Sequence, residues 1–161
     1  QPRHHDLGDE RVNQEFEECL QRSGLRPFPK GARLFQKELT AAEADLAQAK
    51  RTFRARGYKW ATIQGYYAMF HAARALLYVR GYRERSHYCL VVGIRTLFVT
   101  ERLLDPALAE ALQLGKRLRE NADYYDEFSE DGARKMLETA MRFIEQARTL
   151  IGSLQKSKKK S

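Results

Sequence analysis

The chain has 161 residues, of which 43% are hydrophobic and 31% charged, and its formal net charge is +8 at pH 7. This length favours one domain. The composition excludes a disordered chain, and the scarcity of glycine (10) and proline (4) excludes a loop-rich all-β sandwich. No apolar stretch is long enough to span a bilayer, and the N-terminus lacks a signal-peptide pattern. Cys19 and Cys89 indicate buried thiols in a reducing cytoplasm rather than a disulfide framework.

Residues 1–31 are predicted to form an N-terminal helix and a proline-rich strap. We expect residues 1–8 to be a loose leader, and Asp9 to cap a helix that ends near Arg22. The strap that follows holds two prolines within residues 26–31. Prolines remove backbone donors and fix φ, so this segment is not the interior of a helix.

Residues 32–155 are predicted to form an all-α, antiparallel up-down bundle of four main helices, with a C-terminal part that can be split. The four main helices are predicted over residues 32–56, 59–80, 86–100 and 105–126, and a last helix over residues 129–154 forms the C-terminal part. Ser86 and Asp105 are suited to cap two of these helices, and Pro106 suits a first turn. Helix 59–80 is apolar nearly all round, so it belongs at the centre of the bundle or in an oligomer interface.

The C-terminal residues 156–161 contain four lysines and no acid, and we expect them to be a basic disordered tail. No strand pattern is present. The sequence also lacks Cys-x-x-Cys, His-Glu-x-x-His and phosphate-loop patterns, so neither a metal nor a cofactor is expected.

His87 is the first candidate for chemistry, because it follows Ser86 in the first turn of a predicted helix, where it is accessible. The arginines at positions 80, 83 and 85 would lower its pKa and keep it neutral. A neutral imidazole beside arginines suits proton transfer near a phosphodiester. The alternative is a structural histidine that hydrogen-bonds the loop. His71, inside the apolar helix, is expected to be a satisfied core or interface histidine.

A second cluster of polar side chains lies late in the helix predicted over residues 105–126. Arg119 and Asp123 are four residues apart and therefore share a helix face, with Asn121 and Tyr124 nearby. The cluster is either a surface ion pair or a built binding site.

Four segments, residues 58–62, 66–77, 86–90 and 119–124, together resemble the HEPN family over about residues 33–152. More narrowly, the chain is similar to small prokaryotic HEPN proteins that are often encoded beside a minimal nucleotidyltransferase. The resemblance implies a homodimer with a cleft between the protomers. It places the residues that hold RNA or another ligand in that cleft: Arg119, Asn121, Asp123, Tyr124 and Arg83.

Many HEPN proteins are metal-independent endoribonucleases that use an Arg and a downstream His at the cleft. Here residues 119–124 read Arg-Glu-Asn-Ala-Asp-Tyr, so Asp or Tyr stands where the His is expected. Arg80 and His87 are separated by six residues, which fits the spacing of Arg and His in the nuclease motif. They are therefore the candidate catalytic pair.

In paired systems the nucleotidyltransferase is the antitoxin and attaches AMP to a tyrosine, here Tyr124 or Tyr125. The resemblance therefore implies a member of a toxin–antitoxin or defence pair. Its dimer cleft would bind RNA, a nucleotide or the nucleotidyltransferase, and its nuclease motif is degenerate. The alternative is an active toxin that cuts RNA without a metal.

Overall fold

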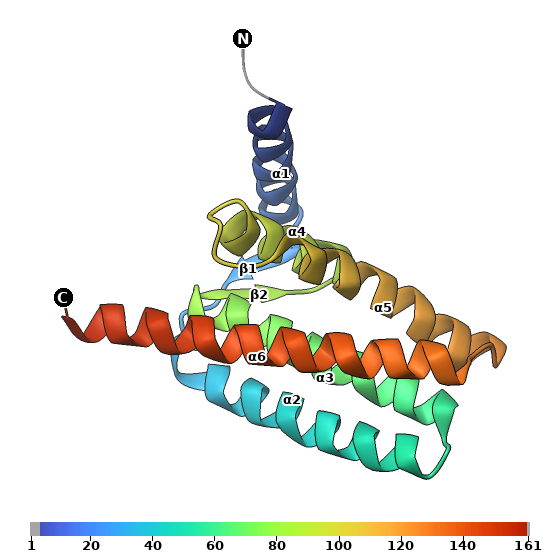
Figure 1. Cartoon of the computed structure of the whole chain (residues 1–161). Helices are drawn as coiled ribbons and strands as arrows, with labels where there is room; N and C mark the ends of the chain where they lie inside the picture. Colours follow the sequence, from blue (N-terminus) through green and yellow to red (C-terminus); the bar gives the residue numbers. More distant parts are fainter. Residues whose placement is uncertain (1–3, 161) are drawn as a thin grey trace.

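The structure, a computed structural model, describes residues 4–160. Residues 1–3 of the expected leader and Ser161 of the expected tail lie outside the described residues. In chain order the elements are α1 (His4–Gln21), β1 (Leu25–Pro27), α2 (Gly31–Arg54), α3 (Tyr58–Val79), β2 (Tyr82–Glu84), α4 (His87–Ile94), the π-helical turn η1 (Arg95–Val99), α5 (Pro106–Tyr125) and α6 (Glu130–Lys160) (Figure 1). The all-α fold class is confirmed.

Helix α3 forms the centre of the bundle and packs against α2, α5 and α6. In Figure 1 it lies behind α6 and above α2. Its alanines at positions 61, 68, 72, 73 and 75 are completely buried. Small side chains let neighbouring helices approach closely, and burial on several faces explains why this helix is apolar nearly all round. Within residues 4–160, no helix is both long and apolar enough to cross a membrane.

Helix α1 projects from the body and is attached at its C-terminal end, beside α4 (Figure 1). It begins at His4, so the expectation of a loose leader is wrong for residues 4–8. The physical reason is that Gly8 costs a helix interior only about 1 kcal/mol, and no proline interrupts residues 4–21.

The expectation that strands are absent is wrong, because β1 pairs antiparallel with β2. Leu25 lies opposite Glu84, and Pro27 lies opposite Tyr82. Pro27 can take part because this two-stranded sheet consists only of edge strands, where a missing donor is tolerated. The strap therefore joins the N-terminal segment to the connection between α3 and α4.

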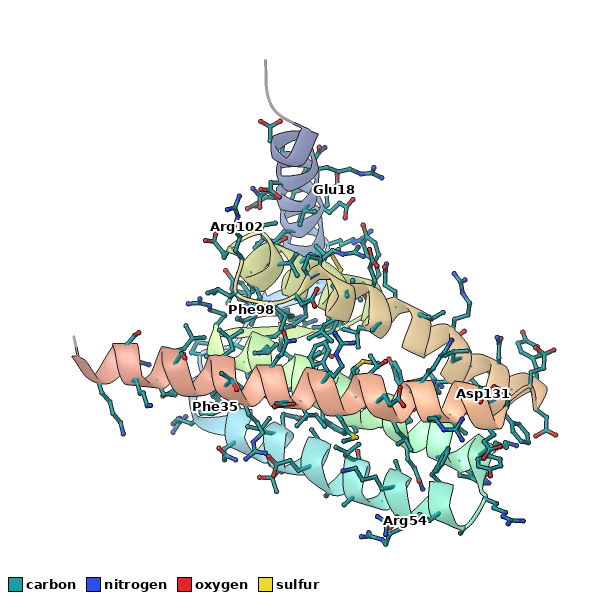
Figure 2. The ribbon with its side chains drawn as sticks, viewed as in Figure 1. Glu18, Phe35, Arg54, Phe98, Arg102 and Asp131 are labelled. Atoms are coloured by element: carbon teal, nitrogen blue, oxygen red, sulfur yellow. A yellow bond between two sulfur atoms is a disulfide. The ribbon has the colours of Figure 1, made fainter. Side chains whose placement is uncertain are left out.

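The helix starts predicted at Ser86 and Asp105 are confirmed, whereas Asp9, which was predicted to cap the first helix, lies inside α1. The Ser86 hydroxyl accepts a hydrogen bond from the Cys89 N–H at 3.1 Å, and the Asp105 carboxylate accepts one from the Ala107 N–H at 2.9 Å. The predicted helix 86–100 is instead divided into α4 and η1, and Phe98 of η1 is completely buried (Figure 2).

Helix α6 continues to Lys160, so the expected disordered tail is wrong for residues 156–160. Lysine is a good helix former, and cations near a helix C-terminus interact favourably with the helix dipole.

Cys19 and Cys89 are joined in a disulfide, although they were expected to be separate thiols. They are 70 residues apart in sequence, and the packing of α1 on α4 brings them together. Gly24 is needed here, because a Cβ at this position would collide with the Cys89 sulfur.

Candidate functional site

The candidate site lies where the start of α4 meets α3 and α5. The Ser86 cap places His87 in the first turn of α4, and the Tyr66 hydroxyl of α3 lies 2.9 Å from its Nδ1. Tyr66 is buried, and burial is the main cause that raises its pKa to about 12. The tyrosine therefore stays neutral and can donate its proton to Nδ1, which leaves the imidazole proton on Nε2.

His87 is neutral at pH 7. Burial, followed by the positive charge of Lys116, lowers its pKa to about 4, while Glu120 opposes the shift. The lowered pKa agrees with the sequence prediction. Its causes, however, are burial and the charge of Lys116 on α5 rather than the neighbouring arginines. His87 is half-buried rather than accessible, and its Nε2 has no hydrogen-bond partner among the described residues.

Arg119 of α5 sits in a cage formed by the rings of Tyr66, Tyr67 and Tyr124, which we call the Arg119 cage. Its guanidinium carbon lies 5.4, 5.7 and 5.6 Å from the three ring centroids. It also donates to the Tyr124 hydroxyl at 3.3 Å and pairs with Asp123 at 3.6 Å. Cation–π contacts hold the guanidinium in place. Its Nε is buried and unpartnered in the described part of the chain.

Beside His87, a cavity of about 350 Å³ opens between α4 and α5, and we call it the α4–α5 pocket. Its lining comes from His87, Tyr88 and Val91 on α4 and from Gln113, Lys116, Arg117 and Glu120 on α5. Two cations thus face one carboxylate, and Lys116 lies 3.6 Å from Glu120. The pocket can take a small anion, because Lys116 and Arg117 give it positive charge.

The structure separates several residues that the sequence grouped together. The Arg80 guanidinium lies over the Phe98 ring, and that of Arg83 lies over Phe28. Neither arginine lines the α4–α5 pocket. His87 is instead accompanied by Tyr66 and Lys116.

The remaining candidates lie at the end of α5. Tyr124 and Tyr125 are exposed, at 65% and 69%. The Asn121 carbonyl accepts the Glu127 N–H at 2.9 Å and closes the helix, so its backbone has a structural role.

Sequence reasoning missed Tyr66 and Lys116 as site residues. Tyr66 was assigned to the apolar centre of the bundle, which is where most of its ring lies. Lys116 is one residue of a basic run, and nothing in its spacing marks it as a neighbour of His87.

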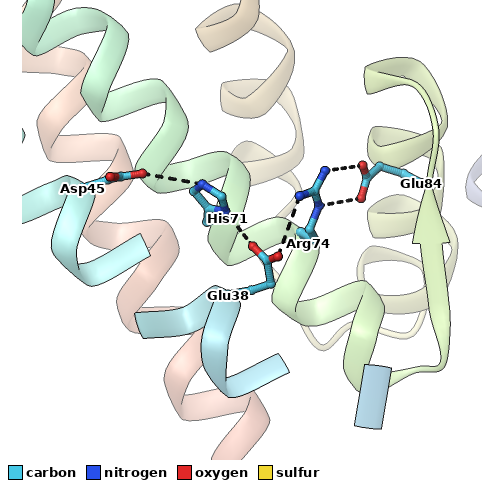
Figure 3. A network of polar contacts seen from close by, with 5 residues as sticks. All are labelled: Glu38, Asp45, His71, Arg74 and Glu84. Carbon is cyan, nitrogen blue, oxygen red and sulfur yellow. Dashed lines mark hydrogen bonds and ion pairs between the residues drawn. The ribbon is translucent and has the colours of Figure 1, made fainter. Parts of the chain in front are cut away.

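A second polar network links α2, α3 and β2 (Figure 3). Arg74 makes two hydrogen bonds of 2.9 Å with the buried carboxylate of Glu84. His71 Nδ1 lies 2.6 Å from Glu38, and its Nε2 lies 3.6 Å from Asp45. Burial opposes the charge of Glu38, but His71 and Arg74 together lower its pKa. His71 is therefore a satisfied histidine, as predicted.

Within the part of the chain that the structure describes, no group of three or more His, Cys, Asp or Glu side chains could hold a metal ion. The model of the HEPN domain matches residues 35–150. The chain belongs to the HEPN family. The match includes α3 and α5 in full and excludes α1 and β1, so the N-terminal segment is an addition to the HEPN domain.

Two curated proteins are similar to this HEPN chain. A protein of Methanocaldococcus jannaschii named "Putative toxin MJ0605" is 28% identical over 68% of this chain and 83% of its own length. A "UPF0332 protein" of Archaeoglobus fulgidus is 33% identical over 68% of this chain and 89% of its own.

Among solved structures, TT1696 from Thermus thermophilus superposes with a TM-score of 0.62 and 17% identity. The superposition covers 73% of this chain and 98% of that one, and it supports the fold.

Proposed function

We propose that this HEPN chain is the toxin-like member of a toxin–antitoxin or defence pair, and that its α4–α5 pocket binds a phosphate of RNA or of a nucleotide. The observation that carries the proposal is an open pocket in which Lys116 and Arg117 lie with the half-buried His87. Two cations that line one pocket favour an anionic oxygen there. The name of the M. jannaschii relative supports the toxin-like role.

Binding fits the chemistry of His87 better than cleavage does. A general acid works best when its pKa lies near the working pH, and the pKa of His87 is about 4. A neutral His87 can donate a hydrogen bond to a phosphate oxygen, but it is a poor source of a proton for a leaving group. We therefore expect binding without cleavage.

The binding test compares a lysine of the pocket with a lysine elsewhere on the surface. Lys116 lines the pocket, whereas Lys37 is exposed on α2. In fluorescence anisotropy with a labelled single-stranded RNA, Lys116→Ala should weaken binding about tenfold and lower the salt slope by about 1. Lys37→Ala should bind like the wild type. Equal losses in both variants would mean that the pocket is not the binding site.

The alternative function is a metal-independent endoribonuclease, and it is tested by incubating tRNA or mRNA with the protein in EDTA. The wild type, His87→Ala and Arg119→Ala should all leave the RNA intact. Cleavage by the wild type that disappears in His87→Ala would establish the nuclease instead.

For the partners, we propose a homodimer and a nucleotidyltransferase encoded nearby. The exposure of Tyr67 at 39% and of Tyr124 at 65%, on either side of the mostly covered Arg119, supports an aromatic face for a second copy. The mass in solution should be that of a dimer for the wild type. It should fall toward that of a monomer when Tyr67 and Tyr124 are both changed to Ser.

The high exposure of Tyr124 and Tyr125 supports their modification by the partner. Incubation with the nucleotidyltransferase and ATP should add the mass of AMP to the peptide that holds them. An unchanged mass would contradict the proposal.

A further inference from the structure

The Cys19–Cys89 disulfide lies next to the α4–α5 pocket. Cys89 belongs to the first turn of α4, two residues after His87, and its N–H is bound by the Ser86 cap. Tyr88, between the two, lines the pocket. The covalent bond therefore joins α1 to the segment that positions the pocket's histidine.

Arg22, just after α1, contacts the same wall. Its guanidinium lies 5.3 Å from the centroid of the Tyr88 ring, and its Nη2 lies 3.8 Å from both sulfur atoms. The N-terminal segment thus places one positive charge against Tyr88, which lines the pocket, although this segment lies outside the HEPN match.

The noncovalent contacts that hold α1 are small in number. Among its described side chains only Phe16 and Cys19 are buried. The Phe16 ring meets the Tyr82 ring edge-on at 5.5 Å, and the Thr96 hydroxyl of η1 donates to the Val12 carbonyl at 3.3 Å. Figure 1 shows the N-terminal half of α1 projecting away from the body. A helix with so little buried surface opens locally at low cost.

Release of α1 would remove a positive charge from beside the pocket. Once α1 is detached, Arg22 would leave the ring of Tyr88, which lines the pocket. The loss of a nearby cation weakens anion binding.

We propose that the Cys19–Cys89 disulfide is a redox clamp, which fixes α1 on α4 and keeps the α4–α5 pocket in its binding form. This inference rests on the proposed function. A dithiol reductant breaks the S–S bond with two electrons and two protons. The chain gains two thiols, and the reductant becomes a cyclic disulfide. Because both sulfurs are buried, α1 must lift before the reductant reaches them.

The test uses the full chain with and without dithiothreitol, and measures hydrogen exchange and RNA binding on the same samples. Reduction should speed exchange about tenfold in residues 8–21 and more modestly in residues 86–91. Affinity for a labelled single-stranded RNA should fall about threefold or more. A variant with Cys19→Ala and Cys89→Ala should match the reduced wild type and ignore dithiothreitol.

Two arginine variants test whether Arg22 acts through its contact with Tyr88 or only through the charge that it adds to this segment. Arg22→Ala should weaken RNA binding in the oxidised protein, whereas Arg11→Ala, which removes an exposed partner of Glu15, should not. Equal effects of the two variants would contradict the role of Arg22.

Unchanged exchange after confirmed reduction would overturn the clamp, as would immediate alkylation of both cysteines in the untreated native protein. Unchanged RNA affinity despite faster exchange would also overturn it. If RNA fails to bind in either redox state while exchange in residues 86–91 responds, the proposed function is contradicted and the clamp on α4 is supported.

Discussion

Tyr66 connects the Arg119 cage to the histidine of the α4–α5 pocket. Its ring packs against the guanidinium of Arg119, and its hydroxyl reaches Nδ1 of His87 at 2.9 Å. This hydroxyl stays protonated at neutral pH, because burial raises its pKa to about 12. One buried side chain thus sets both the tautomer of His87 and the position of Arg119.

Replacing Tyr66 with Phe should separate these two roles. The variant keeps the ring beneath Arg119 and loses the bond to His87, so the free energy of unfolding should fall by about 1 kcal/mol. RNA affinity should fall a few-fold as His87 loses its fixed tautomer. Denaturant unfolding and anisotropy measure the two effects.

Tyr58→Phe is the control, because it removes a tyrosine hydrogen bond to Glu130 at the exposed end of the bundle. It should leave RNA binding unchanged. A loss of affinity in both variants, or in neither, would contradict the link between Tyr66 and the pocket.

The pH dependence of stability should carry the signature of His87. Its pKa is about 4 in the folded chain, whereas an unfolded histidine titrates near 6.5. As the pH falls below about 6.5 the unfolded state takes up the proton first, so stability decreases until the pH approaches about 4.

Between pH 7 and pH 5 this loss should amount to about 1–2 kcal/mol of unfolding free energy. His87→Gln should show a correspondingly smaller loss over the same interval in urea unfolding. The same pH dependence in both proteins would contradict the neutral, buried state of His87.

Among the elements, α2, α3 and β2 are held in register by the network of Glu38, His71, Arg74 and Glu84 (Figure 3). The carboxylate of Glu84 is almost fully covered, and Arg74 also stacks on the Phe70 ring at 4.5 Å. An ion pair in this setting is costly to break, because the remaining charge cannot reach water.

Arg74→Met should therefore lower the free energy of unfolding by about 3 kcal/mol. The matched control is Arg134→Met, which breaks exposed pairs with Glu130 and Asp131 and should cost less than about 1 kcal/mol. Similar losses in chemical unfolding of the two variants would show that the network does not stabilise the fold.

Element starts were predictable where the chemistry is local. Ser86 and Asp105 cap helices through bonds to residues two or three positions ahead, so the sequence alone contains the signal. The pairing of β1 with β2 was not predictable, because each strand has three residues and the partners are 55 or more positions apart. The π-helical turn over residues 95–99 likewise has no local signal in the sequence.

For the molecule as a whole, the sequence predicted the polar cluster on α5 but not the residues that surround His87. Arg119, Asp123 and Tyr124 do interact, since they are close in one helix. Arg80 failed to join His87, because the turn after α3 directs it toward Phe98. Tyr66 and Lys116 reach His87 only through the packing of α3, α4 and α5.

The net charge is unevenly distributed between α1 and the rest of the chain. The chain carries +8 overall, yet α1 contains six acids and one arginine. The HEPN bundle is therefore more basic than the total implies, and a polyanion would be attracted to it rather than to α1.

An NMR titration of the ¹⁵N-labelled histidine side chains with single-stranded RNA asks directly whether phosphate reaches the α4–α5 pocket. The Nε2 resonance of His87 should shift and saturate with the binding curve. The resonances of His71, which is paired with Glu38 on the α2 side of α3, should not change. Saturated binding that leaves His87 unmoved would contradict the proposed site.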